Sequence, residues 1–278
     1  MTTDGTDRQD LLPFVELALR AGEVILDVYA TDFVARAKAD ASPVTEADVG
    51  AEAVILEGLR RLAPGIPVVA EEEAAAGRLP AIGDVFFLVD PLDGTREFLA
   101  RNGEFTVNIA LVRGGVPVLG VVYAPALGVL YGGADGRAFK ASVAGTSLGA
   151  IVPISVRPAA EPVAAIGSRS HGALAAAEWL ARFPSCSFLS AGSSLKFCLV
   201  AEGAADVYPR LGRTMEWDTA AGDAVLRAAG GVVATLEGTP LAYGKRGQAH
   251  DVDFANPHFV AYGDTRLVKG AAVVDGKR

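Results

Sequence analysis

The chain has 278 residues, of which 51% are hydrophobic and 21% are charged, enough apolar material for one large domain or two medium ones. The formal net charge is −8 and no basic run compensates for it, which excludes a surface that binds a nucleic-acid polymer. The most apolar stretch, residues 107–131, is interrupted by Arg113, four glycines and two prolines. It therefore favours strands and turns, and no transmembrane segment is expected.

The N-terminal ten residues are polar and acidic, unlike a secretory signal peptide. The two cysteines, Cys186 and Cys198, lie twelve positions apart, which is neither a zinc spacing nor a disulfide framework. We expect buried free thiols and a reducing cytoplasm. The sequence leaves open a peripheral contact with the inner membrane, and it does not determine an oligomeric state.

The first half of the chain alternates helix and strand signals. Apolar residues at helical intervals predict an amphipathic helix over residues 11–29. A second helix is expected from about Thr45 to Leu62, because Thr45 and Asp48 have the spacing of a capping box. Residues 85–89 predict a short buried strand, and a meander of three strands follows at 106–112, 116–123 and 129–132.

The second half changes character after Ile154. Strand-like pieces are predicted at 164–167, 187–190 and 232–235, and helical ones at 173–182, 194–202 and 219–229. We expect an N-terminal part, 1–152, that carries most of the acidic site residues, and a C-terminal part, 153–278, that completes the site. The pattern indicates an α/β protein in which helices and mixed sheet form layers, with the site in a cleft between the halves.

The segment FFLVDPLDGTREF carries the clearest chemical signal. A buried strand is expected to end at Asp90, after which Pro91 stiffens a turn and Asp93 precedes a helix. Two carboxylates and the Leu92 carbonyl on one rigid turn suit a hard cation such as Mg²⁺. The amides of Gly94 and Thr95 would offer an anion site. An Asx-turn and helix cap without a metal is the simpler alternative.

Two further acids occupy suggestive positions. Glu71 follows the apolar run 66–70 and is the glutamate of its triplet best placed to point inward, whereas Glu72 and Glu73 are expected on a solvated face. Asp218 precedes a predicted helix, where it is equally well explained as a simple N-cap.

A second group of residues suits an additional phosphate. Ser193, Ser194 and Lys196 begin one predicted helix, and Arg210 follows a strand-like segment. His171 follows Ser170 at the start of another helix. From the residues alone, helix caps and surface charges explain this group as readily as a phosphate site does. His250 and His258 are expected at the surface.

Glu71-Glu72, the segment 90–95 (DPLDGT) and the segment 217–222 (WDTAAG) resemble the three motifs of the inositol monophosphatase superfamily, in the same order and with similar spacing. Within it the chain is most similar to the CysQ-type 3'(2'),5'-bisphosphate nucleotidases. The supporting stretches lie at 42–48, 102–112, 120–125, 168–171, 192–203 and 208–210.

The resemblance implies an αβαβα sandwich and a magnesium-dependent phosphatase with two or three ions. Glu71, Asp90 and the Leu92 carbonyl would hold the first ion. Asp90, Asp93 and Asp218 would hold the second, and Glu71 with waters a third, weaker one. A water activated by the metals together with Thr95, which Asp48 orients, would attack the phosphorus.

The residues implied at the substrate are Leu92, Asp93, Gly94, Thr95, His171, Ser193, Ser194, Lys196, Arg210 and Asp218. The expected reaction is hydrolysis of adenosine 3',5'-bisphosphate (PAP) to AMP and phosphate. An inositol or sugar monophosphatase with the same metal core is the alternative, and a non-catalytic regulatory protein is a third. Arg213 stands where close relatives often have proline, which leaves the shape of the loop 211–216 open.

Overall fold

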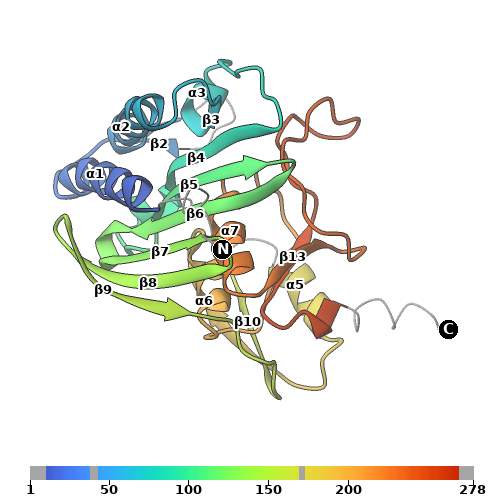
Figure 1. Ribbon diagram of the computed structural model, residues 1–278. Coiled ribbons are helices and arrows are strands. Elements are labelled where there is room, and N and C mark those ends of the chain that lie inside the picture. The colour runs from blue at the N-terminus through green and yellow to red at the C-terminus, as the bar shows by residue number, and fades with distance from the viewer. Residues whose placement is uncertain (1–10, 38–42, 169–172, 269–278) are drawn as a thin grey trace, which may run out of the picture.

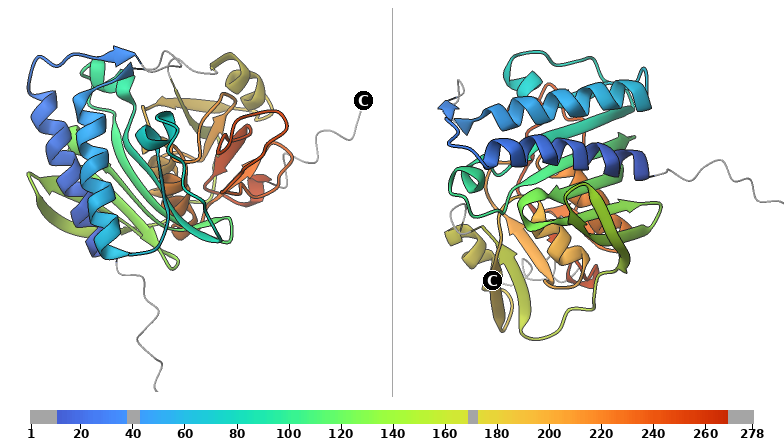
Figure 2. Two further views of the ribbon diagram at one scale, coloured as in Figure 1. Left: turned by 90° about the horizontal axis from the view of Figure 1, so that it is seen from above. Right: turned by 90° about the vertical axis from the view of Figure 1, so that its left-hand side faces the viewer.

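The computed structural model describes residues 11–37, 43–168 and 173–268, and its helices and sheets form alternating layers (Figures 1 and 2). The order of layers is a helix pair, a large sheet, a second helix pair, a small sheet and an outer helix. The expected αβαβα sandwich is confirmed.

The helices are α1 (Leu12–Tyr29), α2 (Glu46–Leu62), α3 (Glu71–Ala75), α4 (Thr95–Leu99), α5 (Ala173–Leu180), α6 (Leu195–Ala201) and α7 (Ala220–Ala228), with a 3-10 turn η1 at Pro125–Leu127. A short ribbon pairs β1 (Arg36–Ala37) with β2 (Pro43–Val44). The large sheet contains β3 (Val68–Ala70), β4 (Val85–Asp93), β5 (Thr106–Arg113), β6 (Val116–Ala124), β7 (Val129–Ala134), β8 (Arg137–Ala144) and β9 (Ser147–Ile154). The small sheet contains β10 (Val163–Gly167), β11 (Cys186–Ser190), β12 (Val207–Arg210), β13 (Val232–Thr235) and β14 (Phe259–Tyr262).

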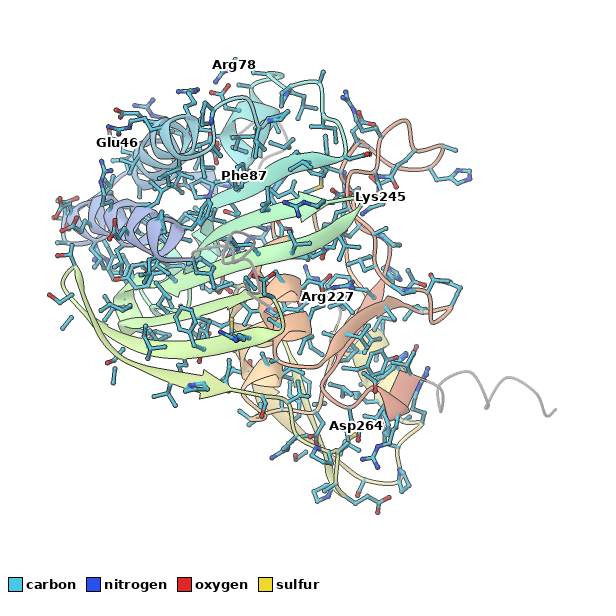
Figure 3. The ribbon with its side chains drawn as sticks, viewed as in Figure 1. Glu46, Arg78, Phe87, Arg227, Lys245 and Asp264 are labelled. Atoms are coloured by element: carbon cyan, nitrogen blue, oxygen red, sulfur yellow. The ribbon has the colours of Figure 1, made fainter. Side chains whose placement is uncertain are left out.

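The helix pair α1 and α2 covers the outer face of the large sheet. The capping box predicted for α2 is present, because Asp48 Oδ2 accepts hydrogen bonds from the backbone nitrogen and the hydroxyl of Thr45, both at 2.7 Å. Phe87 on β4 points into this layer (Figure 3), where its ring centroid lies 5.8 Å from that of Phe14 on α1. Apolar burial therefore holds the first helix layer against the sheet.

In the large sheet the strand order follows the chain from β3 to β9, and every pair is antiparallel except β3 with β4. The predicted meander corresponds to β5, β6 and β7, while β3, β8 and β9 were not predicted as strands. β9 is one of the two outer strands of the sheet and is largely exposed, with Ile151 and Val152 facing solvent, so its sequence lacks a clean buried alternation.

The inner helix pair, α6 and α7, is buried between the two sheets. α7 lies close to the large sheet because Gly120 on β6 has no side chain: a Cβ there would lie 2.3 Å from the Ala221 carbonyl oxygen. Gly133 on β7 has the same role, with Val225 Cα 2.6 Å from the position of a Cβ. This close approach seats α7 on strands β5, β6 and β7 of the large sheet.

The large sheet ends at Ile154 and the small sheet begins at Val163. Both sheets pack on α6 and α7, so they share one core, and the division near residue 152 stays a prediction. Within the described ranges, no helix is long and apolar enough to cross a membrane. Cys198 is buried as expected, but Cys186 is exposed, because β11 is an outer strand whose residues all face solvent.

Candidate active site

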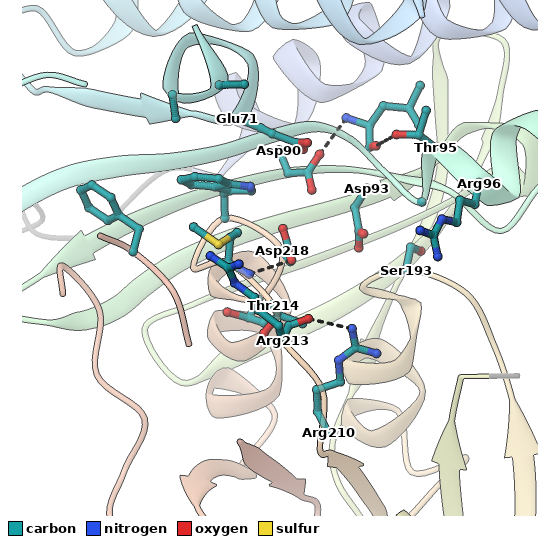
Figure 4. Close-up of a pocket in the computed structure, with 18 of the residues that line it drawn as sticks. Glu71, Asp90, Asp93, Thr95, Arg96, Ser193, Arg210, Arg213, Thr214 and Asp218 are labelled. Carbon is teal, nitrogen blue, oxygen red and sulfur yellow. Dashed lines mark hydrogen bonds between the residues drawn. The ribbon is translucent and has the colours of Figure 1, made fainter. Parts of the chain in front are cut away.

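Four carboxylates from three separate segments face one cavity (Figure 4). Glu71 begins α3, Asp90 and Asp93 lie at the end of β4, and Asp218 lies just before α7. The layered fold brings these segments to the same edge of the molecule, so the structure unites the acids that the sequence selected as metal ligands.

The sequence predicted that the buried strand ends at Asp90, but in the structure β4 continues to Asp93. Asp90 pairs with Asn108 and Asp93 with Thr106, so three steps along β4 correspond to two along β5. In a regular strand, residues three apart point to opposite faces, and one extra residue reverses this alternation. The bulge therefore explains how Asp90 and Asp93 face the same cavity. Pro91, which has no N–H to donate, falls inside the bulge.

These acids are held in a strongly unfavourable environment for negative charge. Burial raises the pKa of Asp90 well above its usual value, and repulsion from Glu71, Asp93 and Asp218 adds to the shift. Burial likewise raises the pKa of Asp93 to about 6. The pKa of Asp218 is also raised, mainly by burial and in addition by repulsion from Asp93 and Glu71. Buried carboxylates require positive charge, and oxygen ligands of this kind suit Mg²⁺.

The donor chemistry thus fits magnesium. In the described part of the chain, no three acidic, histidine or cysteine side chains already stand in metal-ligand geometry. The assignment of individual ligands therefore remains a proposal. Asp218 also accepts a hydrogen bond from the Met215 backbone nitrogen (2.8 Å), and the N-cap of α7 is Thr219, so the simple N-cap interpretation of Asp218 is wrong.

Thr95 and Asp48 meet next to the carboxylates, although 47 residues separate them. The Thr95 hydroxyl donates to Asp48 Oδ1 (3.2 Å) and lies 3.4 Å from the Leu92 carbonyl oxygen. Gly94 enables this placement, since its φ of 93° lies in the left-handed region that side chains disfavour. The predicted Thr95–Asp48 pair is therefore assembled, with Thr95 lining the cavity.

The same cavity, of about 990 Å³, contains a cationic side opposite the acids. Lys196 is only 5% exposed and donates to the Ser193 carbonyl oxygen (2.5 Å). Burial lowers the pKa of Lys196 to about 8, although Asp93 opposes the shift. Arg210, at the end of β12, donates from Nη2 to the Arg213 carbonyl oxygen (3.1 Å).

Two polar atoms on this side are buried and have no hydrogen-bond partner among the described residues: Ser193 Oγ and Arg210 Nε. Ser193 also has a φ of 46°, a strained conformation for a residue with a side chain. Buried donors without partners are costly and are rare in proteins. Both residues line the cavity, so a bound anion would satisfy them.

Ser194, which the sequence predicted at the substrate, is placed differently. Ser194 is not among the residues that line the cavity; its hydroxyl donates to the Asp218 carbonyl oxygen (2.6 Å) and accepts from Asn108 Nδ2 (3.0 Å). It therefore links the Asp218 turn to β5. His171 lies outside the described residues.

The loop between β12 and α7 contains Arg213, which lines the cavity. Its guanidinium group forms an exposed ion pair with Asp251 (3.1 Å), and its carbonyl holds Arg210. The sequence left the shape of the loop 211–216 open; in the structure the loop is held by the side chain of Arg213 and by its backbone carbonyl. His250 and His258 are exposed, as predicted.

Sequence reasoning missed the residues that support the acidic segments. Asn256 donates from Nδ2 to the Met215 carbonyl oxygen (2.8 Å), and Glu216 accepts from the backbone nitrogens of Gly244 (2.6 Å) and Lys245 (2.9 Å). These contacts tie the C-terminal segment to the Asp218 turn, and no local pattern indicates them. Glu52 was also missed, although it lies four residues after Asp48 and hence on the same face of α2.

Comparison with known proteins identifies the family of the chain. The model of the inositol monophosphatase family matches residues 7–258, and the chain belongs to that family. Over 88% of its length it is 49% identical to the 3'(2'),5'-bisphosphate nucleotidase CysQ of Shigella flexneri and 48% identical to that of Escherichia coli K12, in each case covering 96% of the relative. The crystal structure of CysQ from Bacteroides thetaiotaomicron is 37% identical, with a TM-score of 0.75 over 94% of this chain and 99% of that one.

Proposed function

We propose that the protein is a magnesium-dependent phosphatase that hydrolyses adenosine 3',5'-bisphosphate to AMP and phosphate. The observation that carries the proposal is the pairing, within one cavity, of a carboxylate cluster with a cationic side that contains unpartnered buried donors. A substrate with two phosphates places one group on each side. The identity to relatives named 3'(2'),5'-bisphosphate nucleotidases supports the same substrate.

Two or three magnesium ions would occupy the acidic side. Glu71, Asp90 and the Leu92 carbonyl would hold one ion, and Asp90, Asp93 and Asp218 a second. Glu71 would hold a third, weaker ion. Bound magnesium supplies positive charge that offsets the carboxylates and the phosphate, and it lowers the pKa of water. In a chain with a net charge of −8, this local positive charge allows an anionic substrate to bind.

Thr95 and Asp48 orient the attacking water. Because the Thr95 hydroxyl donates its proton to Asp48, its lone pairs are left to accept a hydrogen bond from the water. The water oxygen then faces the phosphorus, and the amides of Gly94 and Thr95 contact the phosphoryl oxygens. The water loses a proton and the ester oxygen gains one, so the products are AMP and inorganic phosphate.

The phosphate that is not cleaved binds on the cationic side. Three residues converge there: Lys196 from α6, Ser193 from the turn that precedes α6, and Arg210 from the end of β12. A guanidinium group binds phosphate through two parallel N–H bonds, and the free Arg210 Nε is one such donor. Ser194 supports the site indirectly, through the Asp218 turn.

This reaction would remove a by-product of sulfate activation and so belongs to sulfur metabolism. The free thiols of Cys186 and Cys198 support a reducing cytoplasm as the compartment.

The test is phosphate release from PAP, AMP and inositol 1-phosphate, with magnesium and with excess chelator. We expect turnover that requires magnesium and a kcat/KM for PAP far above the other two. Faster hydrolysis of inositol 1-phosphate would favour an inositol monophosphatase, and no release from any of the three would refute a phosphatase of this class.

A further inference from the structure

Helix α2 carries two buried carboxylates on one face, one turn apart. Asp48 is 2% exposed and Glu52 is 4% exposed, and a four-residue spacing places their side chains about 6 Å apart along the helix axis. Asp48 holds Thr95, as described above. Glu52 neither lines the cavity nor contacts Thr95, so the proposed reaction leaves it without a role.

Glu52 holds the start of α3. Its Oε2 accepts a hydrogen bond from the Glu72 backbone nitrogen (2.8 Å), and its Oε1 accepts one from the Glu73 backbone nitrogen (3.0 Å). The first amides of a helix lack partners within the helix, and the N-cap of α3, Ala70, provides no side-chain bond. The carboxylate of Glu52 therefore caps α3 from a different helix.

This cap acts at the residue next to the metal-ligand candidate. Glu71 is the first residue of α3, and the two amides that Glu52 binds are those of the next two residues. Two bonds to consecutive peptide groups fix both the position and the rotation of that turn. The direction in which the Glu71 side chain leaves the backbone, toward Asp90 and the cavity, follows from this rotation.

We infer that Glu52 is a positioning residue that holds Glu71 in place for magnesium. With Asp48 holding Thr95, α2 becomes a rigid connection that sets the separation of the Glu71 turn from the Thr95 hydroxyl. The inference rests on the proposed function in that it takes Glu71 as a magnesium ligand.

The experiment compares Glu52→Gln with the wild type. Glutamine keeps the size of the side chain and one oxygen acceptor, but its NH₂ group cannot accept the second backbone N–H. A matched control is Asp206→Asn, because Asp206 is a buried carboxylate (1% exposed) that accepts a backbone N–H from Ala164 (2.7 Å) in the small sheet and does not line the cavity. Both changes remove a buried charge that binds backbone, and Asp206→Asn also breaks the ion pair of Asp206 with Arg157 (2.8 Å), so thermal unfolding is measured for both variants.

Three quantities are measured: magnesium affinity of the substrate-free protein by calorimetry, hydrogen exchange at the amides of Glu72 and Glu73, and kcat with KM for PAP. Burial raises the pKa of Glu52 to about 7, so the titrations are made at about pH 8, where it is ionised. Loss of a partner that orients a ligand typically weakens metal affinity 10- to 100-fold. We expect a weakening of roughly tenfold or more and faster exchange in Glu52→Gln, with neither in Asp206→Asn. At saturating magnesium, KM for PAP should change little.

Equal magnesium affinity in Glu52→Gln and wild type would overturn the inference and leave Glu52 with a role in stability alone. A wild type that binds no magnesium would overturn both this inference and the metal assignment. A wild type that binds magnesium but does not hydrolyse PAP would refute the proposed substrate only, because the affinity and exchange measurements require no substrate.

Discussion

Replacing Lys196 by methionine removes a buried positive charge while keeping an unbranched side chain of similar length. The ammonium group lies beside the cavity at 5% exposure, so water screens its interaction with a bound phosphate only weakly. A hydrogen bond to a charged group contributes about 1.5–3 kcal/mol. Lys196→Met should therefore lower kcat/KM for PAP roughly 10- to 150-fold.

Inositol 1-phosphate provides the internal control, since it has no second phosphate. Its hydrolysis, however slow, should change little in Lys196→Met, because the acidic side and Thr95 still hold the group that is cleaved. Lys196 also bonds to the carbonyl oxygens of Ser193 (2.5 Å) and Ala191 (3.4 Å), so thermal unfolding must be measured in parallel. Equal losses on both substrates would show that Lys196 serves the fold or the chemical step, and specificity would need another explanation.

Arg210 extends the test to a double-mutant cycle. Burial lowers the pKa of Lys196, Asp93 opposes this shift, and the nearby positive charge of the Arg210 guanidinium group adds to it. If both bind one phosphate, the loss in Lys196→Met/Arg210→Gln should differ from the sum of the single losses on PAP. Strict additivity would indicate that the two residues contact separate groups.

Asp93→Asn removes a proposed ligand charge with little change in volume, so we expect a folded protein without phosphate release; near wild-type turnover would contradict the metal assignment. Lithium should inhibit at magnesium concentrations that support activity, since a small monovalent ion in a divalent site binds without activating; a flat lithium titration would place the chain outside the sensitive group. Hydrogen bonds from Arg266 hold the pKa of Asp264 below its ordinary value of 3.8. Its contribution to stability is therefore present above about pH 3.8 and is lost as the pH falls through the folded pKa. Asp264→Asn should lower the urea midpoint at pH 7 by the equivalent of about 1–2 kcal/mol, with a smaller difference from wild type below pH 4; a loss that does not depend on pH would refute this account.

The sequence predicted those helices, strands and turns whose signals come from residues close together in the chain. The Thr45–Asp48 capping box, the apolar spacing of α1 and the Gly/Pro turns of the meander each depend on neighbouring residues, and each is confirmed. β14 was not predicted because it is only four residues long, and β9 was not predicted because most of its residues are exposed. Cys186 was wrongly expected to be buried, since only the strand order makes β11 an outer strand.

For the site, the sequence by itself determined which residue types are present and in which motifs, namely the acids of the three segments, Thr95 and the basic pair. Tertiary structure decided how they meet. A bulge in β4 turns Asp90 and Asp93 to one face, and α2 brings Asp48 to Thr95 and Glu52 to the turn of Glu71. The physical reason is that charges and hydrogen bonds act over a few ångströms in space, whereas these partners lie 20 to 47 residues apart in the chain.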